Sequence, residues 1–317
     1  MGRRRRGRQA GRPAAMVAYF GRSELFFVTR GKERKMRCSR NLIGSLLAAL
    51  TIALSGCKEF SANTPDDEQS ADMLVVLRYC PAMGQFVNLL PRYETGDTEE
   101  TMCRKAEQSL RNREVITLGG FGGYVVLSLS QPIYNNTDRR DLRIYGNAFL
   151  QAGNEEYGNS EPGIVLVSQD LNGNGIADDE WYELAGSEYF KSETTHNYSK
   201  VWHKSDTTLN NIFHTQPYFP LWLTDSIIEV SGTLLASHAV ITNGVVAQQV
   251  LDYGYVDNKA NTDLEGISFD LDWAVDAMGN KVELTYCDFV KVQTAVDEVF
   301  EQIGELSTEV AGIERIE

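Results

Sequence analysis

IVLVSQDLNGNGIADDEWYEL, residues 164–184, sets two short apolar runs on either side of a segment rich in glycine and asparagine. The runs Ile164–Ser168 and Trp181–Leu184 contain the β-branched and aromatic residues that favour strands. Asn-Gly pairs between two such runs are typical of a hairpin turn. We therefore predict an antiparallel β-hairpin here, with residues 169–180 as its connection.

The pattern continues along the chain from Glu114 onward, where short β-rich runs alternate with glycine and asparagine. This spacing, without long helices between the runs, favours a mainly β fold: an antiparallel β-sandwich or jelly roll with one or two short helices. Further strands are predicted at Val115–Leu118, Tyr124–Leu129, Leu142–Tyr145, Ile227–Val230, Val245–Asp252, Ile267–Trp273 and Phe289–Thr294.

Two short helices are predicted outside these strands. Asp97 and Glu100 have the spacing of a capping box, which predicts a helix that continues to about Arg111. The segment Val296–Ile303 is predicted to form a second short helix before a polar end.

The connection of the hairpin has the spacing of a calcium-binding loop. Oxygen-bearing residues occupy positions 1, 3, 5 and 9, glycine occupies position 6, and a backbone carbonyl is available at position 7. Because a strand follows where an EF-hand would continue as a helix, we predict a Ca²⁺ site at a hairpin tip. A turn that needs no ion is the alternative. The predicted ligands are Asp170, Asn172, Asn174, the Ile176 carbonyl and Asp178, with Asp179 as a further candidate.

A lipobox indicates where the protein is found. Leu54-Ser55-Gly56-Cys57 ends the apolar stretch Leu42–Leu54, and Arg37 and Arg40 precede that stretch. This order is typical of a bacterial lipoprotein signal peptide, which makes Cys57 the lipidated residue. Thirteen apolar residues are fewer than the roughly 20 that span a bilayer, which argues against a transmembrane helix.

The predicted organisation follows from this cleavage site. Residues 1–56 are an N-terminal extension plus signal peptide, residues 57–72 are a lipidated disordered tether, and residues 73–317 form the β-sandwich domain. The chain that remains has 17 basic and 42 acidic side chains, a net charge of −25. Such a charge repels nucleic acid, so we expect none as a partner.

The remaining cysteines suit an oxidising compartment. A Cys80–Cys103 disulfide is possible on spacing alone and contributes roughly 3 kcal/mol on the chain-entropy estimate. Cys287 lies in a strand-like run and is predicted to be a small buried hydrophobe.

Aromatic residues between the predicted strands are candidates for a ligand surface, because sugar rings stack on flat apolar faces. Packing beneath a long loop is the alternative. These residues are Tyr198, Trp202, Tyr218, Phe219 and Trp222. By contrast, Trp181 and Trp273 lie within strand patterns and are predicted to belong to the core. The acidic, aromatic segment made of Asp252–Tyr255 and Asp257–Asp263 is a candidate for a second cation or ligand site.

Several motifs carry a resemblance to a known family. DLRIYGNAF at Asp141–Phe149, SEPGIV at Ser160–Val165 and WYELAGSEY at Trp181–Tyr189 resemble segments of Bacteroidetes-type cell-surface lipoproteins. The order of strands and motifs also resembles galactose-binding-like jelly rolls of the discoidin type. This resemblance implies loops at one end of the domain that bind glycans or lipids.

Catalytic motifs are absent from the sequence. It contains no GxSxG, HExxH or P-loop, and the four histidines show no metal-ligand spacing. We expect no enzyme, with a glycoside hydrolase as a minor alternative.

The sequence as a whole predicts a lipoprotein of the outer membrane, displayed at the cell surface, with the periplasmic face as the alternative. We expect a non-catalytic, calcium-stabilised binding module for a glycan or other small nutrient, which it passes to an outer-membrane transporter. The alternative is an accessory or structural subunit of an uptake assembly, including one for a cofactor such as a corrinoid.

Overall fold

The computed structural model describes residues 17–21, 24–28, 74–151, 154, 156–206, 217–242, 245–301 and 303–316. The chain divides into two compact units, Met1–Asp67 and Glu68–Glu317. In the first unit, β1 (Val17–Gly21) and β2 (Glu24–Val28) form an antiparallel hairpin. The predicted lipobox with Cys57 and the predicted tether 57–72 lie outside the described residues.

A six-stranded antiparallel sheet forms the centre of the second unit, with the strand order β16-β10-β9-β17-β5-β3. It contains the predicted hairpin, in which Trp181 pairs with Ser168. The strands of this main sheet are β3 (Val75–Cys80), β5 (Tyr124–Tyr134), β9 (Gly163–Ser168), β10 (Trp181–Leu184), β16 (Ala274–Val275) and β17 (Tyr286–Thr294).

Smaller antiparallel sheets surround the main sheet. A three-stranded sheet has the order β15-β6-β21, a four-stranded sheet has the order β13-β14-β8-β7, and three pairs are β11-β12, β18-β19 and β20-β4. Their strands are β4 (Ile116–Thr117), β6 (Leu142–Tyr145), β7 (Phe149–Leu150), β8 (Tyr157–Asn159), β11 (Thr195–His203), β12 (Ile227–Leu234), β13 (Ala239–Thr242), β14 (Val245–Gln249), β15 (Ser268–Phe269), β18 (Val299–Phe300), β19 (Gly304–Glu305), β20 (Glu309–Val310) and β21 (Gly312–Arg315).

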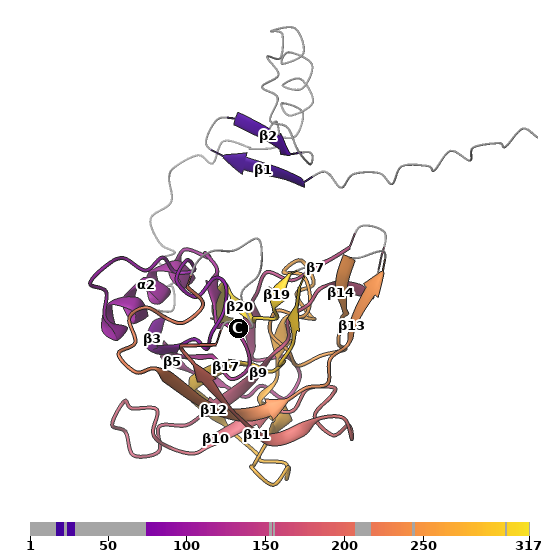
Figure 1. Ribbon diagram of the computed structural model, residues 1–317. Helices are drawn as coiled ribbons and strands as arrows, with labels where there is room; N and C mark the ends of the chain where they lie inside the picture. Colours follow the sequence, from indigo (N-terminus) through magenta and orange to yellow (C-terminus); the bar gives the residue numbers. More distant parts are fainter. Residues whose placement is uncertain are drawn as a thin grey trace, which may run out of the picture. The chain divides into compact units, whose positions relative to one another are not determined.

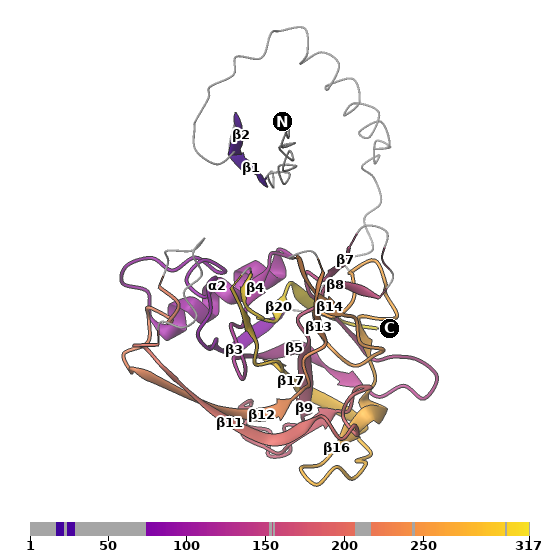
Figure 2. The ribbon, with the colours of Figure 1, turned by 45° about the vertical axis from the view of Figure 1, so that its right-hand side comes forward.

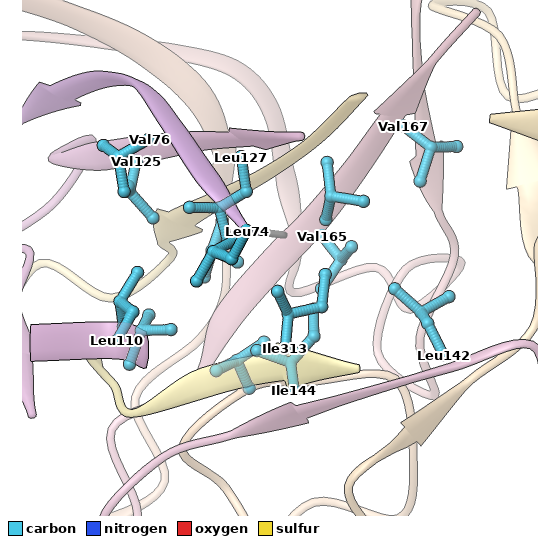
Figure 3. Close-up of a cluster of buried hydrophobic side chains, with 14 of the residues drawn as sticks. Leu74, Val76, Leu110, Val125, Leu127, Leu142, Ile144, Val165, Val167 and Ile313 are labelled. Carbon is cyan, nitrogen blue, oxygen red and sulfur yellow. The ribbon is translucent and has the colours of Figure 1, made fainter. Parts of the chain in front are cut away.

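The hydrophobic core lies on one face of the main sheet. Alternate residues of β5 and β9, such as Val125, Leu127 and Val165, point to this face, as the two-residue period of a strand requires. They pack against Ile144 of β6 and Ile313 of β21, so two sheets enclose the core (Figure 3). Burying each of these side chains contributes about 1.5–3 kcal/mol.

The helix α2 (Glu99–Arg111) also covers this core with Met102, Ala106 and Leu110. Its N-cap is Thr98, whose hydroxyl accepts a hydrogen bond from the Thr101 N–H at 3.3 Å.

The predicted capping box is therefore wrong in its first residue. The Asp97 carboxylate instead accepts from the Glu94 N–H and forms an ion pair with Lys105. The predicted second helix over Val296–Ile303 is also wrong, because Val299–Phe300 forms β18 and pairs with Gly304–Glu305. Gly304, the first residue of β19, has a φ of +86°, a backbone conformation that favours glycine.

The opposite face of the main sheet is partly covered by the β11–β12 hairpin. Figures 1 and 2 place this hairpin and α2 on opposite sides of strands β5, β9 and β17. Gly122, which precedes β5, has a φ of +83°, and a Cβ atom there would lie 2.4 Å from Val230 of β12. The amide of Gln293 on β17 donates to the Ser231 carbonyl of β12 at 2.9 Å. Only a glycine therefore lets β12 approach the sheet this closely.

The predicted fold class is confirmed: the domain is mainly β, with antiparallel sheets arranged in the layers of a sandwich. The predicted strand Ile267–Trp273 is shorter than expected, because β15 ends at Phe269 and Leu271–Trp273 forms a 3₁₀ turn. Among the described residues, no helix is both long and apolar enough to cross a membrane.

Candidate functional site

The connection between β9 and β10 is held by its own polar side chains. The Asp170 carboxylate accepts hydrogen bonds from the N–H groups of Asn174 at 3.0 Å and Gly175 at 2.8 Å. The Asn174 side-chain oxygen accepts from the Ile176 N–H at 2.7 Å. Gly173 and Gly175 have φ values of +69° and +73°, so the loop turns where glycine is favoured.

The predicted calcium ligands converge in part. The side-chain amides of Asn172 and Asn174 both donate to Asp178, at 3.3 and 3.2 Å, which places these three side chains around one centre. The Ile176 carbonyl accepts from the Asp178 N–H, and the Asp179 carboxylate turns away to accept from the N–H of Leu171. Rotation of the two amides would present oxygens in place of nitrogens, because the two ends of the group have nearly the same shape.

A cavity of about 660 Å³ lies beside this loop. Loop residues 175–178 and Trp181 form one part of its lining, and Gly122 with residues of strands β3, β5, β12 and β17 forms the rest. Trp181 was predicted to lie in the core, but it is half-buried and lines this cavity instead. The volume falls within the range of about 300–1,000 Å³ that is typical of small-molecule sites.

The floor of the cavity is the outer face of the main sheet. Val126 of β5 pairs with Arg78 of β3 on one side and with Lys291 of β17 on the other, and all three line the cavity. The Lys291 ammonium lies 4.4 Å from the centre of the Tyr124 ring. Burial lowers the pKa of Lys291, and burial together with the nearby Cys80 raises the pKa of Tyr124 to about 12.

A group of three acidic side chains lies elsewhere in the domain. Ligand atoms of Glu161, Asp257 and Glu309 lie within 4.8 Å of one another, and Asp257 and Glu309 are buried. Asp257 accepts from the backbone N–H groups of Asn147 and Glu309, at 2.7 and 3.0 Å. Glu309 accepts from two hydroxyls, those of Ser307 at 2.7 Å and Thr117 at 3.1 Å. We call these three residues the buried carboxylate cluster.

The buried carboxylate cluster has no cationic side chain to balance it in the described part of the chain. Burial raises the pKa of Glu161 to about 8, and the charge of Asp257 adds to this effect. Burial, followed by the charges of neighbouring carboxylates, also raises the pKa values of Asp257 and Glu309 well above the usual range. Such a group either keeps protons at neutral pH or holds a cation that replaces them.

Glu305 is a fourth acidic side chain near this cluster. It is buried, its Oε1 accepts from the Gln85 N–H at 2.7 Å, and its Oε2 has no hydrogen-bond partner. Burial raises the pKa of Glu305 to about 7, and its charge in turn raises the pKa of Glu161.

Sequence reasoning located this site only in part. Of the acidic segment Asp257–Asp263, Asp257 joins the cluster, whereas the Asp263 carboxylate accepts from the Gly266 N–H. Glu161 precedes β9 and Glu309 lies on β20, so no local spacing connects them to Asp257.

The predicted aromatic ligand surface is not formed. Trp202, Tyr218 and Trp222 are at most 6% exposed. Tyr198 packs edge-on against Phe121, with ring centres 5.0 Å apart. The structure shows the alternative of packing: Trp202, Tyr218 and Phe219 belong to a small second core, and Trp222 packs into the main core.

The cysteines within the described ranges are free thiols, so the expected Cys80–Cys103 disulfide is not formed in this structure. Each of the two thiols has another partner: Cys80 is hydrogen-bonded to the Tyr124 side chain and Cys103 to the Tyr79 backbone. Burial raises the pKa of both thiols, which lowers their reactivity. Cys287 is buried, as predicted.

Comparison with known proteins adds no assignment. No protein-family model matches the chain, and no curated protein matches it.

Proposed function

We propose that this protein is a non-catalytic, calcium-stabilised binding module for a glycan or other small nutrient. One observation carries the proposal: residues 175–178 of the predicted calcium loop form part of the lining of the 660 Å³ cavity. A cation that orders the loop would therefore also fix one wall of the cavity. Calcium and ligand would then each increase the affinity for the other.

The chemistry of the loop supports a weak calcium site. Two of the ligands are asparagines, so only Asp170 and Asp178, with Asp179 as a further candidate, bring negative charge. Extracellular modules of this kind bind Ca²⁺ with dissociation constants of about 10⁻⁴ to 10⁻³ M. Such a site is filled where calcium is millimolar.

The buried carboxylate cluster is the second cation site of the proposal. Carboxylate oxygens are the ligands that hard cations such as Ca²⁺ prefer. The cluster joins a residue before β9, a residue after β14 and a residue of β20. A cation there would link parts of the domain that are distant in the sequence.

The lipobox supports the proposed location at the outer membrane. With acyl chains on Cys57, the module is held on the outer membrane, displayed at the cell surface, and passes its ligand to a transporter there. Two or more acyl chains are needed for a firm anchor.

A glycan array tests the function directly. The full-length chain in detergent is applied in 5 mM calcium and again in EDTA, and binding is expected only with calcium. The variant Asp170→Ala is expected to lose binding in calcium, whereas Asp225→Ala, at an exposed position outside the loop and cavity, is expected to bind in calcium as the unmodified chain does. Binding that is equal with calcium and with EDTA would contradict the proposed link.

A further inference from the structure

Two cationic side chains on the cavity floor lack an acidic partner. Neither Arg78 nor Lys291 forms an ion pair with any residue that the structure describes. Lys291 is half-buried, and its ammonium lies over the face of the Tyr124 ring. A partly desolvated ammonium without a counter-ion is costly, so this position favours an anionic group from outside the chain.

The register of the sheet fixes how the two cations lie. Arg78 and Lys291 are both opposite Val126, one strand to either side of β5. Because neighbouring strands are about 4.8 Å apart, their Cα atoms are separated by about 10 Å, which leaves room for a small anionic group between the side chains. A β-bulge between Val76 and Arg78 directs both Leu77 and Arg78 to the cavity.

Two acidic residues also line the cavity, and they enter it from other elements. Asp178 belongs to the calcium loop, where its carboxylate is held by the amides of Asn172 and Asn174. Glu229 comes from β12, is exposed, and forms no ion pair with a residue in the described ranges. The cavity thus has a cationic floor and acceptor groups on its walls, with free space between them.

We infer that the cavity takes an acidic sugar, with its carboxylate between Arg78 and Lys291 and its hydroxyls toward Glu229. An acidic sugar supplies an anion for the floor, hydroxyl donors for an acceptor on the wall, and an apolar ring face for Trp181. This inference rests on the proposed function, because it takes the cavity as the ligand site. It adds the chemical class of the ligand.

Isothermal titration calorimetry on the full-length chain in detergent and calcium tests the inference. The probes are a galacturonic acid trisaccharide, the corresponding neutral galactose trisaccharide and a sulfated galactose trisaccharide. We expect the uronate to bind most tightly, and its affinity to fall as salt is added. Lys291→Met and Arg78→Met are each expected to weaken uronate binding by about 10- to 100-fold.

Controls separate binding from folding. Lys281→Met removes a cation at an exposed position outside the cavity and is expected to leave the affinity unchanged. Lys291→Arg keeps the positive charge and is expected to retain uronate binding. If Lys291→Met does not fold, Arg78→Met still tests the inference, because the Arg78 side chain is exposed.

The outcomes distinguish this inference from the proposed function. Equal binding of uronate and neutral sugar, unchanged in both variants, would overturn the inference and leave the binding module in place. A preference for the sulfated probe over the uronate would overturn the assignment of a carboxylate. If no probe binds, the inference fails, and the glycan array then decides the proposed function separately.

Discussion

The stability of this domain should depend on pH in an unusual direction, and Glu305 provides the sharpest test. Its carboxyl group is buried, with one oxygen bonded to the Gln85 N–H and the other without a partner. Glu305→Gln keeps the shape and an oxygen that accepts from Gln85, and it removes the ionisable group. The change therefore isolates the titration of one side chain.

The direction of this pH dependence follows from the raised pKa of Glu305. Burial raises the pKa of Glu305 from 4.5 to about 7, so the folded protein binds this proton more tightly than the unfolded chain does. The stabilising contribution of the neutral form is complete below about pH 4.5 and is lost as the pH rises toward 7. The rise of the pKa from 4.5 to about 7 corresponds to about 3 kcal/mol of stability in the free energy of unfolding. Glu161, with a pKa raised to about 8, adds to the loss in the same window.

Urea unfolding of the full-length chain in EDTA, followed by circular dichroism between pH 5 and pH 8, measures this effect. The free energy of unfolding is expected to fall for the unmodified chain and to fall by about 2.5 kcal/mol less for Glu305→Gln, because part of the contribution is already lost at pH 5. Glu301→Gln, at an exposed position, serves as the matched control and should follow the unmodified chain. Identical pH profiles for the unmodified chain and Glu305→Gln would refute the reasoning. Calcium should restore more stability at pH 8 than at pH 5, since cation and protons compete for the buried carboxylate cluster.

Three further predictions concern other parts of the molecule. Asp178→Ala should reduce the rise in melting temperature that millimolar calcium gives the unmodified chain, because only the buried carboxylate cluster then still binds the ion; an unchanged rise would remove Asp178 as a ligand. Trp202→Ala should cost about 3–5 kcal/mol in urea unfolding, because the side chain is 3% exposed and its N–H donates to the Phe121 carbonyl at 3.0 Å. Val201→Ala is its control, with a side chain that is 44% exposed and an expected change within about 0.5 kcal/mol. Cys57→Ser should move the protein from the membrane fraction to the soluble fraction, and fatty-acid labelling should disappear; a labelled variant would exclude Cys57 as the lipidation site.

The strands could be predicted because their signal is local. The alternation around Val125 and Leu127 and the glycines between β9 and β10 identify the hairpin and the main sheet without knowledge of any distant contact. The prediction of a helix at Val296–Ile303 was wrong. The apolar spacing of this segment suits a short helix, whereas Gly304 and the pairing of β18 with β19 favour a hairpin. Propensity is weak over so few residues, and tertiary contacts decided the outcome.

The residues of a candidate site could likewise be predicted only where they lie close together in the sequence. The loop Asp170–Asp179 is continuous, so candidate ligands in it could be named from spacing alone. The buried carboxylate cluster needs three separate segments, and the cavity needs strands β3, β5 and β17 in register. Trp181 was wrongly assigned to the core, because a strand pattern in the sequence does not show which part of the sheet β12 leaves uncovered.

The pairing of the last strands has a consequence for how the chain is made. Val310 of β20 pairs with Ile116 of β4, and Gly312 of β21 pairs with Tyr145 of β6. Until residue 312 has left the ribosome, β4 and β6 therefore lack these partners and expose unpaired backbone edges. Such edges invite aggregation. Shielding of these two edges until β20 and β21 have been made would therefore reduce aggregation of the nascent chain.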